Sequence, residues 1–232
     1  MNSRRLFISS LATLAFASVG SSAPSDTPAA PVTAVFVDPN APEVADVRKK
    51  GEDAINGLGY MMVQEITDAV NKRGAEAAID VAHLKKLPKT NGRLTDLPNI
   101  TAVKRTSLRL RDRANAPDAG DALALQRLEQ QLTSGDSLSP VLVQRIDRPN
   151  ATPEWRVYRP FSALPICLEC HGERDGQSAE LRAKLDQLYP LDQAVAYTAT
   201  EWCGVLRVTV DLRPPPPAPA PTQAKPAPKT KN

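Results

Sequence analysis

Three residues that lie close together in the sequence have the chemistry to hold a redox cofactor. Cys167, Cys170 and His171 form a Cys-x-x-Cys-His motif, which is typical of covalent c-type haem attachment. In such a site each thiol adds to one vinyl group of the porphyrin, and the adjacent imidazole reaches the iron from the proximal side. The motif therefore predicts a single covalently attached haem c with His171 as an iron ligand.

Other kinds of site use the same residue types. Cys167 and Cys170 could instead form a structural disulfide, act as a redox-active dithiol, or provide half of a zinc site. A zinc site would need two more ligands, for which the remaining cysteine and histidine of the chain are Cys203 and His83. A thioredoxin-like dithiol is expected within a βαβ unit. Haem attachment is therefore the leading interpretation.

The N-terminus carries a basic and then an apolar pattern. Arg4 and Arg5 precede an apolar stretch that begins at Leu6 and ends in small residues. This predicts a secretory signal peptide over residues 1–23. The apolar run is shorter than the roughly 20 residues needed to cross a bilayer. We expect a protein that is exported to the periplasm and soluble there, with no stable membrane insertion after signal removal. The arginine pair also resembles a twin-arginine signal, so the export route stays open.

Composition indicates one globular domain between two segments that lack a core. The chain has 232 residues, of which 41% are hydrophobic and 4% aromatic. Residues 24–41 predict a flexible leader, and the Pro, Ala and Lys residues of 214–232 predict a disordered tail. Residues 42–213 have the size of one domain. The net charge of +3 comes partly from the signal and the tail, so we expect no nucleic-acid partner.

Apolar spacing and turn residues divide this domain into helices and strands. Apolar residues three or four positions apart predict helices over residues 43–73, 75–87, 119–132 and 178–188. Alternation predicts strands over residues 100–111, 140–147, 154–161 and 204–212, of which the second and third form an antiparallel hairpin. This order favours an α+β fold, an antiparallel sheet flanked by helices that lie on one of its faces.

Five short motifs match a known family in order and spacing. They are RTSLRLR at 105–111, NAPD at 115–118, YRP at 158–160, CLECHG at 167–172 and YPLDQA at 189–194. With these motifs the chain resembles the Tll0287-like haem family, also called DUF3365, over about residues 75–212. The resemblance implies a PAS-like domain with a single c-type haem. It also implies a role in electron transfer or in sensing, because the family occurs alone and as sensor modules of signalling proteins.

The resemblance leaves the second iron ligand open. It implies a cysteine shortly after the Ala-Ile pair at 78–79, but Ala82 stands there and His83 follows. A haem held by His171 and His83 is therefore one hypothesis. One helical step turns a side chain by about 100°, so His83 is no simple replacement for a cysteine at 82, and it could equally be a surface residue.

Sulfur ligands are the other candidates for the second axial position. Met61 and Met62 lie in an apolar helix, where methionine is more often core filler. Cys203, beside Trp202, could be a small buried residue, a free thiol or an intermolecular disulfide partner. A methionine ligand would raise the reduction potential, whereas an open position would admit NO, CO or O₂.

Basic and aromatic residues are candidates for the porphyrin edge. Arg105, Arg109 and Arg111 would share one side of the first predicted strand, where they could pair with the haem propionates or form a solvated basic edge. Tyr158 and Arg159 could close over the porphyrin, although core packing explains Tyr158 equally well.

These observations predict a periplasmic monohaem cytochrome that exchanges one electron with a redox partner protein or senses redox state. The alternative is a haem-based gas sensor that signals to a separate partner protein, because no kinase-like or cyclase-like segment follows residue 212. We do not expect an enzyme, since no nucleophile with a base, paired carboxylates or phosphate loop is visible. A peroxidase-like activity would need distal acid and base groups.

Overall fold

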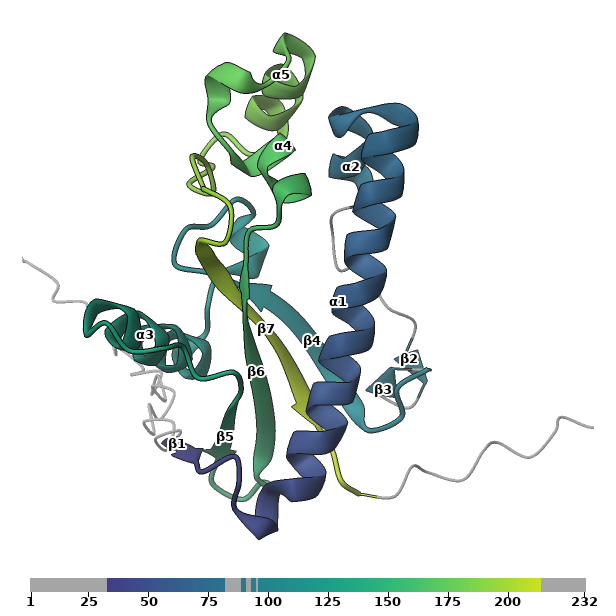
Figure 1. Cartoon of the computed structure of the whole chain (residues 1–232). Coiled ribbons are helices and arrows are strands. Elements are labelled where there is room, and N and C mark those ends of the chain that lie inside the picture. The colour runs from purple at the N-terminus through teal and green to yellow at the C-terminus, as the bar shows by residue number, and fades with distance from the viewer. Residues whose placement is uncertain (1–32, 82–88, 91–92, 95, 214–232) are drawn as a thin grey trace, which may run out of the picture. The chain divides into compact units, whose positions relative to one another are not determined.

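A five-stranded antiparallel sheet forms the centre of the described domain (Figure 1). The computed structural model describes residues 33–81, 89–90, 93–94 and 96–213. In spatial order the strands are β1 (Thr33–Val37), β5 (Leu142–Asp147), β6 (Glu154–Ser162), β7 (Trp202–Val210) and β4 (Ile100–Thr106). A small separate hairpin joins β2 (Lys89–Thr90) and β3 (Arg93–Leu94). The sheet confirms the predicted α+β class and the β5–β6 hairpin.

Helices cover both faces of this sheet. The α-helices are α1 (Ala45–Arg73), α2 (Ala75–Val81), α3 (Ala119–Thr133), α4 (Leu168–His171) and α5 (Ala179–Leu188). Short 3₁₀ turns occur at η1 (Pro42–Val44), η2 (Arg113–Asn115), η3 (Pro165–Cys167) and η4 (Arg174–Gly176). Helix α1 packs on one face of the sheet, and α3 packs on the other. The expectation that the helices share one face is therefore wrong.

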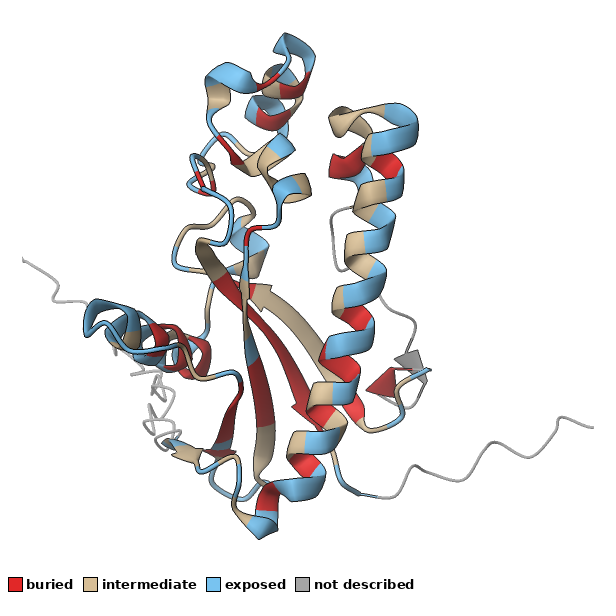
Figure 2. Cartoon of the chain, viewed as in Figure 1, coloured by how far each residue is buried: buried red, intermediate tan, exposed pale blue. Residues whose placement is uncertain are grey.

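Residue alternation along the central strands explains how one sheet serves two helices. On β7, Leu206 and Val208 belong to the apolar cluster beneath α1, whereas Val205 belongs to the cluster beneath α3. On β6, Val157 and Tyr158 divide between the two clusters in the same way. Successive side chains of a strand point to opposite faces. The central strands are therefore buried on both sides, as the burial colouring indicates (Figure 2).

Helix α1 lies close to the sheet along its first half and continues beyond the sheet along its second. Its backbone approaches β6 so closely at Gly51 that a Cβ there would overlap the Val157 side chain. The second half stands with α2 opposite α4 and α5 (Figure 1). Helix α2 contacts α5 there. The first half of α1 thus packs on the sheet, and its second half faces the segment that carries the cysteine motif.

Several predicted boundaries need correction. The leader expected over residues 24–41 contains strand β1, which pairs with β5. The 3₁₀ turn η1 begins directly after this segment, at Pro42. The strand expected over 100–111 ends at Thr106, where the chain leaves the sheet. The predicted signal peptide, the tail and residues 82–88 lie outside the described residues. Within the described ranges, no helix is both long and apolar enough to cross a bilayer.

A buried carboxylate holds α3 against the sheet. Asp121 is fully buried, and its oxygens lie 3.0 Å from Lys104 Nζ, 3.3 Å from Arg156 Nη1 and 3.3 Å from Arg207 Nε. The Tyr158 hydroxyl lies 3.2 Å from the same carboxylate. The side chain of Asp121 also accepts from the Asp118 backbone in the capping box at the start of α3. Asp121 therefore pairs with three cations that the sheet directs toward α3, and one of them, Arg156, also pairs with Asp118 and Glu154.

We predict that Asp121→Asn lowers the free energy of unfolding by about 3–5 kcal/mol, because it removes one side of a buried ion-pair network. The urea midpoint measured by circular dichroism tests this. The matched control is Asp136→Asn, at an exposed site, where the change should stay within about 0.5 kcal/mol. Equal midpoints for the two variants would contradict the structural role of Asp121.

Candidate functional site

The three residues of the cysteine motif lie on two consecutive helical turns at the end of β6. Pro165 begins η3, a position where proline suits a helix start, and α4 follows without a break. Cys167, Cys170 and His171 occupy neighbouring positions on these turns, because residues three and four apart share a helix face. All three line one cavity of about 460 Å³, a size within the usual range for cofactor sites.

A backbone carbonyl sets the orientation of the His171 ring. His171 Nδ1 lies 2.8 Å from Ala194 O, and because a carbonyl only accepts, Nδ1 must carry the proton. Burial and the neighbouring Arg111 guanidinium lower the pKa of His171 to about 3. The ring is therefore neutral at physiological pH, and Nε2 keeps a free lone pair. The ring also packs edge-on against Tyr197, with centroids 6.3 Å apart.

The segment that orients His171 is itself attached to the motif. The Tyr197 backbone N–H donates to His171 O at 2.9 Å, and the Ala196 N–H donates to Gly172 O at 3.0 Å. Gly172 must remain small, because a Cβ there would lie 2.7 Å from Leu168 O. The end of α4 and residues 194–197 therefore form one hydrogen-bonded unit.

Arg111, which follows β4 in the chain, donates hydrogen bonds to both parts of this unit. Its Nε donates to Asp192 Oδ2 at 2.9 Å, and its Nη2 donates to Cys170 O and to Ala194 O. The side chains of both Arg111 and Asp192 are largely buried. Arg111 thus connects the motif with the carbonyl that orients His171.

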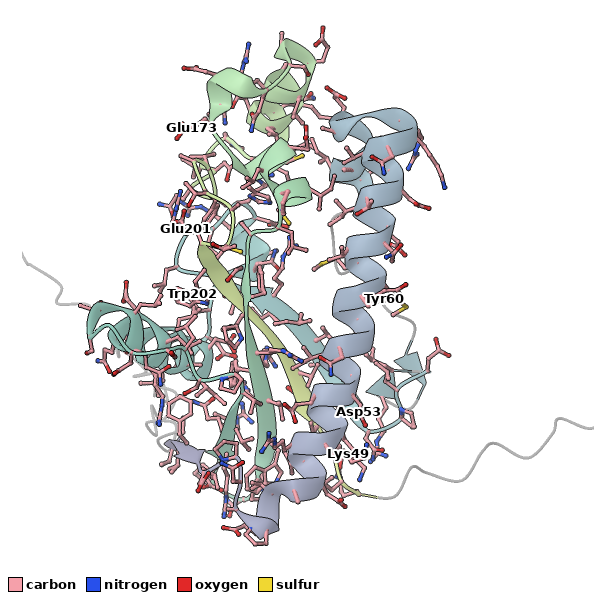
Figure 3. All side chains as sticks on the ribbon, in the orientation of Figure 1. Lys49, Asp53, Tyr60, Glu173, Glu201 and Trp202 are labelled. Carbon is pink, nitrogen blue, oxygen red and sulfur yellow. The ribbon has the colours of Figure 1, made fainter. Side chains whose placement is uncertain are left out.

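Arg109 supports the same segment from its outer side. It donates to Gln193 O at 3.2 Å, to Val195 O and to Glu201 Oε1 at 3.1 Å. Its guanidinium carbon stacks 4.0 Å from the centre of the Tyr197 ring. Glu201 lies just before β7 (Figure 3). Arg109 and Arg111 follow β4 rather than forming part of it, so they do not share a strand face with Arg105 as predicted.

The two thiols of the motif meet different apolar groups. Cys170 packs beside Ile79, Leu181 and Leu185 of the neighbouring helices, and burial raises the pKa of its thiol. Cys167 packs against a second cluster, made of Ala163, Ala194 and Tyr197 together with Leu168 and Cys203. All three cysteines are free thiols.

Helix α1 provides the opposite, apolar wall of the cavity. Most of its lining residues recur at helical spacing and form one apolar stripe: Ile55, Gly59, Met62, Val63, Ile66 and Val70. Asn56 and Tyr60 of α1 also line the cavity. A Cβ at Gly59 would meet nothing within 4 Å, so the cavity extends up to the helix backbone there. Ala78 and Ile79 of α2 continue the apolar lining.

The structure brings some of the predicted site residues to the cavity and separates others from it. Arg105 lines the cavity from β4 with Arg109 and Arg111. Tyr158 does not: it is fully buried on the α3 face of the sheet, where its hydroxyl contacts Asp121 and Gln144. Its neighbour Arg159 reaches the cavity instead.

The candidates for the second iron ligand also differ in whether they line the cavity. Met62 and Cys203 line the cavity. Met61 is 52% exposed and does not belong to the lining. His83, the predicted histidine ligand, lies outside the described residues.

Sequence reasoning missed several residues of the site. Ala194 acts through its backbone carbonyl, which has no side-chain signature. Tyr197 and Asn56 carry no motif, and Asn56 reaches the site through its contact with Arg159. Gly59 also carries no motif, although it lies on the same helical stripe as Ile55 and Met62. That periodicity was the one signal that could have identified it.

The residues present fit a covalently attached haem. Two free thiols and one neutral imidazole with a free Nε2 converge on a single cavity, and they are the donor set that c-type attachment uses. The α1 wall leaves open space beside Gly59.

Comparison with known proteins gives two matches. The Tll0287-like family model matches residues 47–211 of the chain. The crystal structure of the cyanobacterial heme-protein Tll0287 has 18% sequence identity and a TM-score of 0.47, and the match covers 75% of this chain and 97% of that chain. The search of curated proteins gave no match.

We predict that Arg111→Ala loosens the unit that orients His171. The variant loses all three hydrogen bonds of this guanidinium and leaves Asp192 buried without its cation, which should cost about 3 kcal/mol of stability. Hydrogen exchange followed by mass spectrometry should show faster exchange in peptides covering residues 167–172 and 192–197. Arg113→Ala, at an exposed site, is the control, and equal exchange in the two variants would refute the assignment.

Proposed function

Because the chain belongs to the Tll0287-like family, we propose that it is a haem-binding cytochrome with one haem c attached at Cys167 and Cys170 and coordinated by His171. The observation that carries the proposal is the arrangement of His171. Its ring is neutral, its Nδ1 donates to Ala194 O, and its Nε2 remains available in a cavity that the two thiols share. A metal-ligating histidine typically has its other nitrogen bonded in this way.

The two cysteines would carry the covalent links. Each thiol adds across one vinyl double bond, so the sulfur bonds to one vinyl carbon and its hydrogen passes to the other. The addition neither consumes nor releases electrons. It requires reduced thiols, and both cysteines of the motif are free in the structure.

The rest of the site would control the environment of the cofactor. When bound, haem supplies a reversible one-electron change at its iron. The α1 stripe and the two clusters around the cysteines line the cavity with apolar side chains. The identity of the axial ligands and the burial of the haem both affect the reduction potential. Arg159 donates to Asn56 of α1 at an exposed position on the cavity edge. There its guanidinium could pair with a propionate. Arg105 is a further cation in the lining.

One-electron exchange with a redox partner protein, or redox sensing, is the function this site supports best. We propose that the protein acts after export to the periplasm and that it is not an enzyme. Gas sensing is the alternative, and it requires an open iron position. Adding CO to the ferrous protein separates the two: no change in the absorption spectrum supports a carrier or redox sensor with two protein ligands, whereas CO binding supports a gas sensor.

We predict that the double variant Cys167→Ala and Cys170→Ala carries no covalent haem. The wild-type protein, produced in a host that matures c-type cytochromes, should exceed its polypeptide mass by one haem and show a Soret band. Cys203→Ser is the control, because Cys203 lies outside the motif, and it should keep one covalent haem per chain. A wild-type protein with bare polypeptide mass and no Soret band would disprove the proposal.

We predict that Gly59→Leu reduces haem loading whereas Gly57→Leu does not. A side chain at Gly59 would project into the cavity, while Gly57 lies on the exposed side of α1, away from the lining. Leucine is a better helix former than glycine, so neither change should unfold the helix. The measurement is the ratio of covalent haem to protein. A ratio of one in both variants would contradict haem binding against this wall.

A further inference from the structure

We propose that Met62 provides the second axial ligand of the haem iron and that Arg105 orients its sulfur. This inference rests on the proposed attachment of haem at the cysteine motif and names a further residue of that site. His171 approaches the cavity from α4, and α1 forms the wall across from it (Figure 1). The two axial ligands of a haem bind from opposite faces of the porphyrin, so the second ligand should come from the α1 side.

Few described residues of the α1 wall have an atom that can bind iron. The other α1 residues that line the cavity are aliphatic or glycine, except for Asn56 and Tyr60. Asn56 Oδ1 already accepts a hydrogen bond from Arg159. Tyr60 also lines the cavity, but its side chain is largely in solvent, with 68% of the residue exposed (labelled in Figure 3). The thioether of Met62 is left as the candidate on this helix.

The neighbouring methionine has the opposite orientation. Met61 is exposed and outside the lining, whereas Met62 is partly buried and inside it, because consecutive residues of an α-helix point about 100° apart. Met62 Sδ lies 3.5 Å from Arg105 Nη1. The side chain of Met62 from α1 and the side chain of Arg105 from β4 therefore meet at the cavity.

Cys203, the other sulfur candidate in the cavity, lies on the His171 side. It belongs to the apolar cluster that contains Cys167, Ala194 and Tyr197. Ala194 accepts the hydrogen bond from His171, and Tyr197 packs against the His171 ring. Cys203 Sγ donates to Phe161 O at 3.5 Å. Cys203 therefore lies among the residues that surround His171 and not on the α1 wall, which makes Met62 the better placed sulfur for the opposite side.

Arg105 is placed to position the Met62 sulfur. Arg105 pairs with Leu206 across β4 and β7, and so it shares the α1 face of the sheet. A thioether sulfur has two lone pairs, one of which can bind iron while the other accepts the Arg105 N–H. A cation beside the sulfur also disfavours the more positive ferric state. It acts in the same direction as methionine ligation, which raises the reduction potential.

The test compares Met62→Leu with Met61→Leu in the full chain matured with haem. We expect both variants to keep one covalent haem, measured by mass and by the alkaline pyridine spectrum. Met62→Leu should lose the near-infrared band that thioether ligation gives ferric haem, should bind CO when reduced, and should have a lower midpoint potential. Met61→Leu should match the wild type in all three measurements.

Two further variants test the ligation by residue 62 and the role of Arg105 separately. Met62→His should restore six-coordination with a potential below that of the wild type. Arg105→Gln should keep the thioether band but lower the midpoint potential, because the sulfur remains and the cation is gone. A structural role of Arg105 alone would leave the potential unchanged, and that result would overturn its assignment as a positioning residue.

The outcomes separate this inference from the proposed function. If the wild type carries covalent haem and Met62→Leu has an unchanged spectrum and potential, Met62 is not the ligand. If His83→Ala changes the ligation instead, the second ligand is histidine and the inference is overturned. If no covalent haem forms in the wild type, the proposed function itself fails.

Discussion

The hydrogen bond from His171 Nδ1 to Ala194 O is the interaction on which the candidate site depends. It defines the tautomer, the direction of the ring and the nitrogen that remains free. The carbonyl can do this because residues 192–197 are held in place: Arg111 links Asp192 and Ala194 to the motif, and Arg109 stacks on Tyr197. Two arginines that could have served the cofactor directly are thus engaged with the protein, and they act through the histidine they help to orient.

The two faces of the sheet have separate tasks. On the α3 face, a buried network centred on Asp121 joins Lys104, Arg156 and Arg207 to the helix. On the α1 face the core is apolar, and it continues beyond the sheet as the wall of the cavity. The charged network therefore stabilises the domain without placing carboxylates beside the proposed cofactor, and the apolar wall is free to contact a porphyrin.

Much of the secondary structure follows from local pattern. The hairpin β5–β6, helix α1 and helix α3 agree with the predictions from apolar periodicity and turn residues, because these patterns depend only on residues a few positions apart. Strand β1 could not be found in this way, because its sequence is short and follows a stretch of small residues, and it exists through pairing with β5. The end of β4 at Thr106 was also hidden, since the alternation of arginine and leucine continues past the point where the strand leaves β7.

By itself the sequence determined the motif of Cys167, Cys170 and His171, the family and the α+β class, because these depend on residue identity and short spacing. Only the tertiary structure decided which residues share the cavity. Tyr158 and Arg159 are adjacent in the chain, yet one lies under α3 and the other reaches the cavity. Met61 and Met62 divide in the same way between solvent and cavity. The physical reason is that one residue along a strand reverses the face, and one residue along a helix turns the side chain by about 100°. Which face meets the site therefore depends on how the elements pack.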